Sequence, residues 1–293
     1  NAMCYCRGHL KDYDSWAEAG AEGWASGDVL PYFIKSEDQE NGGSDFHGVG
    51  GPLAVQNLRH HNPLSDVFLE AAQQAGHPRT HDFNGPHQRG FDFYQVTQRN
   101  GRRCSTAVGY LRPALKRPNL SVQTKAQATR VLFDGTRATG VEYRVGRDLR
   151  TDYGGRVILS GGAINSPQLL MLSGIGPPDV LQSAGIDVRH ALPGVGRNLQ
   201  DHLDVCTLVH CSEPVTYDKL NEFFAGLRYL FDRRGPASSN IAEAGGFLVS
   251  RHATDDRPDI QMHFVPAFLD DHGRNRIEGN GMTIHACALR PES

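Results

Sequence analysis

An apolar run that ends in two glycines, followed by a helical pattern, is the part of this 293-residue sequence best suited to binding a cofactor. The run spans residues 156–163, and the helical pattern begins at Ser166-Pro167. A buried strand, a glycine turn and a helix N-terminus together bring backbone N–H groups up to an anionic ligand. Close packing of a strand on a helix produces the same pattern without a ligand, so the residues alone leave both interpretations open.

Complete nucleotide-binding and hydrolase motifs are absent from the sequence. Gly194-Val195-Gly196 and Gly174-Ile175-Gly176 both lack the third glycine of the dinucleotide fingerprint G-x-G-x-x-G. Neither G-x-x-x-x-G-K-[ST] nor G-x-S-x-G occurs, so phosphate-loop NTPases lose their main support. An unrelated α/β hydrolase stays as the weakest alternative.

The histidines and cysteines show no metal-binding pattern. None of the fourteen histidines lies in H-E-x-x-H or at another spacing that places three ligands on one element, so the sequence predicts no metal site. His263 and His285 lie in apolar, strand-like runs, where an imidazole needs a partner or a function. The six cysteines lack the dense spacing of a disulfide scaffold and are expected to be reduced thiols.

The periodicity of apolar residues predicts both helices and strands. Helical spacing covers residues 62–76, with Asn62 as the N-cap, and residues 220–231 predict a second helix. Short β-branched runs between residues 120 and 145 predict strands with a hairpin turn at Asp134-Gly135, and residues 283–288 predict a last strand.

Composition excludes several classes of partner. The net charge of −3 comes from 30 basic and 33 acidic residues that are mixed along the chain, so no basic block would attract nucleic acid. No stretch approaches the roughly 20 apolar residues of a membrane span. We therefore expect a cytoplasmic chain, with association with the inner face of the membrane as an alternative.

Three stretches, in the right order, resemble the signatures of the glucose-methanol-choline oxidoreductase family. Residues 1–16 are similar to the tail of the first signature, residues 162–177 to the whole second signature, and residues 194–202 to a third family stretch. The nearest likeness is to the branch of choline and bacterial aliphatic-alcohol dehydrogenases, and it is carried by residues 46–53, 94–98, 242–247 and 257–259.

The resemblance implies an FAD-dependent oxidoreductase that oxidises a primary alcohol, choline-like or aliphatic, to an aldehyde by hydride transfer to the flavin. It also implies a quinone or another carrier as electron acceptor. Compared with the family pattern, the chain is expected to be an internal fragment without the dinucleotide fingerprint and without the catalytic histidine. We therefore expect no catalytic residue and no bound FAD in this chain alone. A non-catalytic substrate-binding fragment is the alternative.

The fold class that the resemblance implies is α+β, with an antiparallel substrate-binding sheet domain and part of an α/β FAD-binding domain. Residues 1–60 and 120–205 are assigned to the FAD-binding domain, and residues 61–119 and 206–293 to the substrate-binding domain. An apolar helix with Leu169, Leu170 and Leu172 would be exposed in such a fragment, so we expect self-association.

Seven residues are predicted to contact the cofactor: Asn1, Ala2, Met3, Ala128, Gly162, Ala163 and Asn165. Asn1 falls where some relatives have a histidine bonded covalently to flavin, so the resemblance implies non-covalent FAD. Ala128 falls where the family usually has a valine whose backbone touches the adenine.

Glu243 and His263 are the candidates for the substrate site. Glu243 falls where choline-oxidising relatives have a glutamate that faces the substrate ammonium, and a carboxylate there would attract a cationic alcohol. The alternative is a buried glutamate paired with a nearby arginine.

Overall fold

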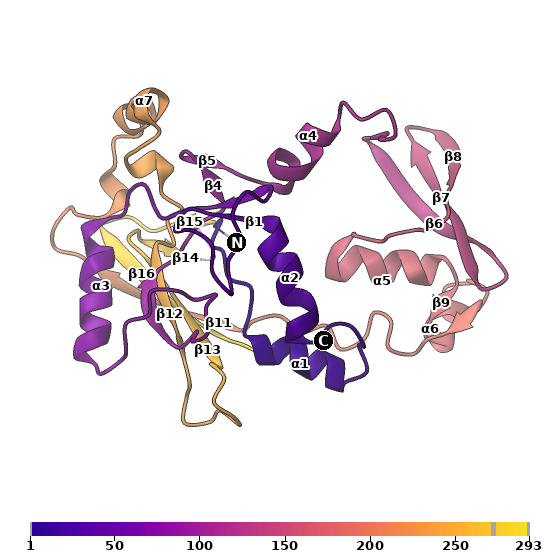
Figure 1. Cartoon of the computed structure of the whole chain (residues 1–293), viewed down its shortest axis with the longest axis horizontal. Coiled ribbons are helices and arrows are strands. Elements are labelled where there is room, and N and C mark those ends of the chain that lie inside the picture. Colours follow the sequence, from indigo (N-terminus) through magenta and orange to yellow (C-terminus); the bar gives the residue numbers. More distant parts are fainter. Residues whose placement is uncertain (1, 271–273, 292–293) are drawn as a thin grey trace. The chain divides into compact units, whose positions relative to one another are not determined.

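The computed structural model describes residues 2–270 and 274–291, and the chain divides into two units (Figure 1). Unit 1 contains the residues up to Arg117 together with His202–Arg290. Unit 2 contains Pro118–Asp201 and Pro291. The boundaries of unit 2 lie near the predicted ones at 120 and 205. Residues 2–60 pack with unit 1, and their assignment to an FAD-binding domain stays a prediction.

Helices and strands alternate irregularly along the chain. The helices are α1 (Leu10–Glu18), α2 (Ser26–Ser36), α3 (Pro63–Gln74), α4 (Arg112–Ala114), α5 (Gly162–Leu172), α6 (Pro178–Ser183) and α7 (Glu222–Asp232). The strands of the larger sheets are β3 (Gly90–Phe93), β6 (Ala126–Asp134), β7 (Arg137–Val145), β8 (Asp148–Tyr153), β11 (Asp204–His210), β12 (Ala244–Leu248), β13 (Ile260–Val265) and β16 (Gly281–Ala288). Two-stranded ladders are formed by β1 (Glu37–Gln39) with β2 (Leu53–Val55), β4 (Gln98–Arg99) with β5 (Arg102–Arg103), β9 (Ile175–Gly176) with β10 (His190–Ala191), and β14 (Leu269–Asp270) with β15 (Asn275–Arg276).

Unit 1 is built on an antiparallel five-stranded sheet with the order β11-β16-β13-β12-β3. Helix α3 covers one face, and the core between them contains Leu69, Phe91 and Phe264 (Figure 1). On the opposite face Tyr94 and Phe247 pack together with other side chains. Burial of these apolar groups on both faces is the main stabilising contribution to the sheet.

Unit 2 consists of the antiparallel sheet β6-β7-β8 with α5 packed against β6. The hydroxyl of Ser173, which follows α5, joins the two elements: it accepts a hydrogen bond from Val131 N (2.8 Å) and donates one to Leu169 O (2.6 Å). Val131, Pro177 and Leu181 are buried apolar side chains of this unit. Among the described residues, no helix has the length and apolar character that a bilayer span requires.

The structure confirms several predicted elements and corrects three. Helices α3 and α7, the β6–β7 hairpin and strand β16 lie where the sequence predicts them. Residues 120–122 and 156–160 form no strand, although both runs are apolar. A strand needs a neighbour to complete its backbone hydrogen bonds, and no described strand pairs with residues 156–160. The side chain of Ile158 is 84% exposed. Helix α5 also begins at Gly162, earlier than predicted.

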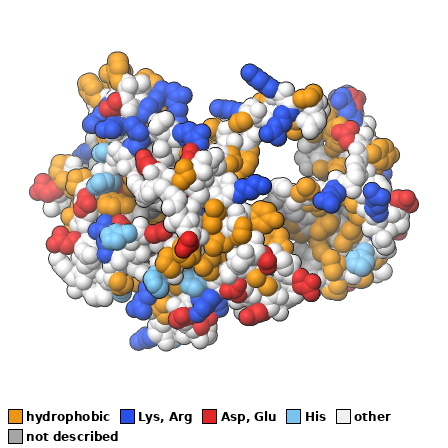
Figure 2. Space-filling view, viewed as in Figure 1, with side chains coloured by type: hydrophobic (Ala, Val, Ile, Leu, Met, Phe, Trp, Pro, Cys, Tyr) orange, Lys and Arg blue, Asp and Glu red, His pale blue; other side chains and the backbone are white. Residues whose placement is uncertain are grey.

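Helices α5 and α7 each expose several apolar side chains. No residue of α5 is buried, although the helix is apolar, and Ile164 and Leu172 are exposed. Helix α7 exposes Phe223, Phe224 and Phe231, and Figure 2 shows hydrophobic side chains gathered over it with Lys and Arg beside them. Exposed apolar patches of this kind favour association, and self-association stays a prediction.

A buried ionic network links Arg7, near the N-terminus, to other residues of unit 1. Glu37, which is fully buried, accepts from Arg7 Nη2 at 2.6 Å and lies 3.0 Å from His47 Nδ1. His47 Nε2 lies 2.8 Å from Asp82 Oδ2. The hydrogen bonds to Asp82 and then to Glu37 raise the pKa of His47 to about 9. The sequence analysis did not identify this network.

The stability of the chain is expected to fall as pH rises through about 9. The pKa of His47 is above its ordinary value of 6.5, so its contribution is complete below pH 6.5 and is lost as the folded chain deprotonates. We expect the free energy of unfolding to fall by about 1–3 kcal/mol. This is less than the full pKa shift of His47 would give, because water screens the partly exposed Asp82. Urea unfolding from pH 6 to pH 10 measures it. His47→Gln is the matched control, and an unchanged pH slope in this variant would contradict the assignment.

Candidate functional site

A pocket of about 420 Å³ lies in unit 2 between β6, α5 and the segment that precedes α5. It brings together two predicted cofactor residues that are distant in sequence, Ala128 and Asn165. Its lining combines apolar side chains with amide and hydroxyl groups; the lining residues are Gln127, Ala128, Val141, Ile158, Leu159, Ser160, Gly161, Asn165, Ser166, Gln168, Leu169 and Leu172. A concave apolar site with a few polar groups is typical of small-molecule binding.

The glycine turn beside this pocket starts α5. Gly162 has a φ of +82°, which a residue with a Cβ rarely adopts, and Gly161 N donates to Ser166 Oγ at 2.9 Å. Gly162 and Ala163 do not line the pocket but lie next to Gly161, which does. The sequence therefore located the turn correctly, although it predicted a buried strand before it.

The first residues of unit 1 have an unusual backbone conformation. Ala2 and Met3 both have a positive φ, at 44° and 60°, which costs energy in residues with a Cβ and is frequent at functional sites. Met3 O accepts a hydrogen bond from Thr97 N at 2.9 Å, and Tyr5 N donates to Gln95 O at 2.8 Å. This segment thus lies along residues 95–97 of unit 1. Asn1 lies outside the described residues.

His263 lies on the face of the unit 1 sheet opposite α3, beside Tyr94. The two ring centroids are 5.1 Å apart, and Gly245, directly across from His263 on β12, leaves room for the Tyr94 ring. His263 Nδ1 is buried without a hydrogen-bond partner in the described part of the chain. Burial lowers the pKa of His263 to about 4, so the imidazole is neutral near pH 7 and its free nitrogen can bond to a hydroxyl group.

Glu243 is fully buried, and its carboxylate accepts four hydrogen bonds. Oε2 accepts from Asn62 N and Ser65 Oγ, both at 2.7 Å. Oε1 accepts from Tyr217 Oη and Ser239 Oγ, both at 2.5 Å. These donors differ from the arginine that the sequence analysis considered, but the contacts favour the structural alternative. The substrate-facing role stays a prediction.

The four donors explain why a carboxylate is needed at this position. Asn62 is the N-cap of α3 and Ser65 is the third residue after it, so Glu243, the residue before strand β12, supplies the acceptor that a capping box normally takes from the helix itself. The positive end of the helix dipole also favours an anion there. Burial and then the charge of Glu243 raise the pKa of the Tyr217 hydroxyl, which keeps it a donor.

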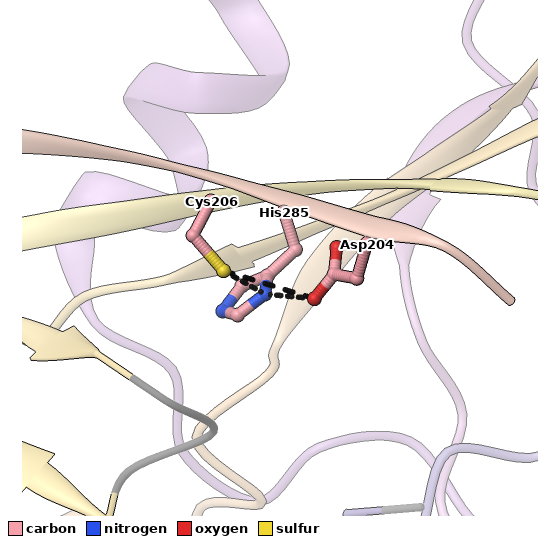
Figure 3. A group of neighbouring side chains, drawn as sticks. All are labelled: Asp204, Cys206 and His285. Atoms are coloured by element: carbon pink, nitrogen blue, oxygen red, sulfur yellow. Dashed lines mark hydrogen bonds and ion pairs between the residues drawn. The ribbon is translucent and has the colours of Figure 1, made fainter.

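One group of side chains in unit 1 was not predicted. Asp204, Cys206 and His285 lie together on one face of the sheet, at β11 and β16 (Figure 3). No metal site was predicted, because no single element carries three ligands. The local signals of this group are the alternation of Asp204 and Cys206 along one strand and the position of His285 in an apolar, strand-like run.

Comparison with known proteins identifies the family. The family model of GMC oxidoreductases matches residues 1–204. The chain belongs to the GMC oxidoreductase family. The solved structure of pyridoxine 4-oxidase from Mesorbium loti is similar with a TM-score of 0.85 and 29% identity, covering 100% of this chain and 55% of that one. The α+β fold class predicted from the sequence is thereby confirmed.

Two relatives within the family are similar along the whole chain. Mitochondrial choline dehydrogenase of Mus musculus is 45% identical over 298 residues, which cover 100% of this chain and 50% of the relative. The Pseudomonas putida protein named alcohol dehydrogenase (acceptor) is 44% identical over 302 residues, which cover 100% of this chain and 54% of the relative. The chain therefore spans about half the length of these GMC oxidoreductases.

Proposed function

We propose that this chain acts in an FAD-dependent oxidoreductase that oxidises a primary alcohol to an aldehyde. The pocket of unit 2 carries the proposal, because it joins the predicted cofactor residues Ala128 and Asn165 in a member of the GMC oxidoreductase family. When bound, FAD would supply the flavin as the acceptor for a hydride from the alcohol carbon. The chain's own residues bind and orient the two molecules.

The residues of unit 2 fit the adenine half of FAD. Apolar walls from β6 and α5 suit the faces of a flat ring, and Asn165 and Ser160 offer polar groups for its edge. Gly162 and Ala163 would approach the same half from the start of α5. Ala2 and Met3 in unit 1 stay proposed cofactor contacts, since strain at consecutive residues supports a functional role there.

The proposed substrate is choline or a neutral aliphatic alcohol, as the names of the two relatives suggest. His263 supports this role because its buried nitrogen has no described partner and can accept from, or donate to, an alcohol hydroxyl. A quinone or another carrier is the proposed electron acceptor.

The adenine site predicts saturable binding of AMP to the purified 293-residue chain, with uridine monophosphate as the control ligand. Ala128→Phe places a large side chain in the pocket and is expected to raise the Kd for AMP at least about tenfold. This corresponds to a loss of roughly 1.4 kcal/mol of binding free energy. Ala126→Phe is the matched control, because Ala126 lies on the same strand but does not line the pocket. Calorimetric titration measures both. Absence of saturable AMP binding, or equal loss in the two variants, would overturn the adenine assignment.

A further inference from the structure

Three potential metal ligands converge at the edge of the unit 1 sheet. Asp204 and Cys206 alternate onto one face of the edge strand β11, and His285 on β16 is the direct partner of Cys206. His285 Nδ1 lies 2.7 Å from Asp204 Oδ2 and 3.1 Å from Cys206 Sγ. The sulfur lies 3.7 Å from the same carboxylate oxygen (Figure 3). All three residues are partly buried.

Nδ1 of His285 is shared by two neighbours, and the thiol of Cys206 also points to the carboxylate oxygen of Asp204. The carboxylate and the sulfur both approach Nδ1, and a ring nitrogen carries either one proton or one lone pair. A proton on Nδ1 that points to Asp204 is not available for a full bond to Cys206. A cation between the three atoms would accept a lone pair from each of them, so the convergence suits a metal ion.

An unpartnered polar atom in the group supports the same conclusion. Asp204 Oδ1 is buried without a hydrogen-bond partner among the described residues. His263, which lies directly opposite His285 on β13, is assigned to the substrate and is not one of the ligands. Buried polar atoms normally have partners, and an ion is one explanation when they lack them.

The atomic separations are close to those of a tetrahedral zinc site. Zinc bonds of roughly 2.0–2.3 Å to nitrogen, oxygen and sulfur place neighbouring ligand atoms about 3.3–3.6 Å apart. The present separations are 2.7 Å between Nδ1 and Oδ2, 3.1 Å between Nδ1 and Sγ, and 3.7 Å between Sγ and Oδ2, so zinc binding would widen the shortest of them by about 0.6 Å. We propose that Asp204, Cys206 and His285 bind one zinc ion, with the fourth position open to water. The thiolate and imidazole disfavour magnesium and calcium.

Zinc binding would fasten the edge strand of the sheet. Strand β11 has a described neighbour on one side only, β16, and the three ligands come from both strands. The ion therefore links the edge strand to the next one through side chains, in addition to the backbone ladder. We expect zinc to raise the melting temperature of the chain, because it binds the folded state.

The test is zinc titration of the untagged chain, with competition against a chromophoric chelator. We expect one zinc per chain, and Cys206→Ser and His285→Gln are expected to bind at least about 100-fold more weakly, since even an outer-shell change costs 10- to 100-fold. Cys211→Ser is the matched control, because this thiol follows β11 but is not part of the group. No stoichiometric zinc, or unchanged binding by Cys206→Ser, would overturn the proposal.

If the variants do not fold, substitution of cobalt for zinc in the wild-type chain tests the same site. Cobalt in the wild-type chain is expected to show a thiolate charge-transfer band in the near ultraviolet and the visible bands of a tetrahedral ion. A cobalt complex of the wild-type chain without the thiolate band would exclude Cys206 as a ligand and overturn the site.

Discussion

Replacing Glu243 by alanine is expected to lower the free energy of unfolding by about 3–5 kcal/mol. The carboxylate is fully buried and accepts from one backbone N–H and three hydroxyl groups. Its removal leaves these donors without an acceptor in a site that water does not reach. It also removes the anion at the N-terminus of α3. Urea unfolding of the purified chain measures the change.

Two further variants separate the structural role of Glu243 from a substrate role. Ser65→Ala removes one donor and is expected to cost about 1 kcal/mol. Glu243→Gln keeps the shape and removes the charge. In a full-length protein that joins this chain to a dinucleotide-binding segment and to a segment with the catalytic histidine, Glu243→Gln is expected to reduce kcat/KM equally for choline and for its neutral isostere, in which carbon replaces the quaternary nitrogen. A selective loss for choline, with an unchanged melting temperature, would instead support the substrate-facing role.

Gly245→Ala is expected to destabilise the chain by a similar amount, about 3–5 kcal/mol. An added Cβ would lie 2.0 Å from Met262 O and 2.5 Å from the Tyr94 ring. The carbonyl belongs to the neighbouring strand β13, and Tyr94 is fully buried with its hydroxyl bonded to that same carbonyl at 2.7 Å. Neither group can move without disturbing the sheet beside His263. Thermal unfolding followed by circular dichroism measures the loss.

Gly226→Ala is the matched control for this variant. Gly226 lies inside helix α7, and an added Cβ would have no atom within 4 Å. Alanine favours a helix interior over glycine, so this change is expected to stabilise the chain by about 0.5–1 kcal/mol. Equal stability of the two variants would show that the close approach at Gly245 is relieved by local movement.

The sequence predicted those elements whose pattern is local. Helix α3 has apolar residues at helical spacing and an asparagine cap, and the β6–β7 hairpin has a strong turn signal, so neither needs distant contacts to be recognised. The apolar run at 156–160 predicted a buried strand, but a strand requires a neighbour and none of the described strands provides one. Strand β8 was missed because all six of its residues are exposed and show no apolar alternation.

The candidate site residues were likewise predicted where their pattern is local and missed where it depends on distant contacts. The glycine turn was located, and Asn165 was predicted as a cofactor contact, because the second signature is continuous in sequence. The proposed zinc ligands and the donors to Glu243 come from distant parts of the chain, and only the strand register and the helix position bring them together. Two residues on one strand and a histidine far along the chain carry no recognisable spacing until the pairing is known.

The division of unit 1 into two segments has a consequence for the order of folding. Strand β3 precedes unit 2 in the chain, and its partner β12 follows it, so the central sheet closes only after the whole of unit 2 has been synthesised. Unit 2 consists of hairpins and short local contacts, which form faster than pairings between distant segments. If unit 2 is already folded, it holds its two ends at a fixed separation and lowers the entropy cost of closing the loop between β3 and β12. Unit 2 would thus act during synthesis as a folding template for the sheet that surrounds it in sequence.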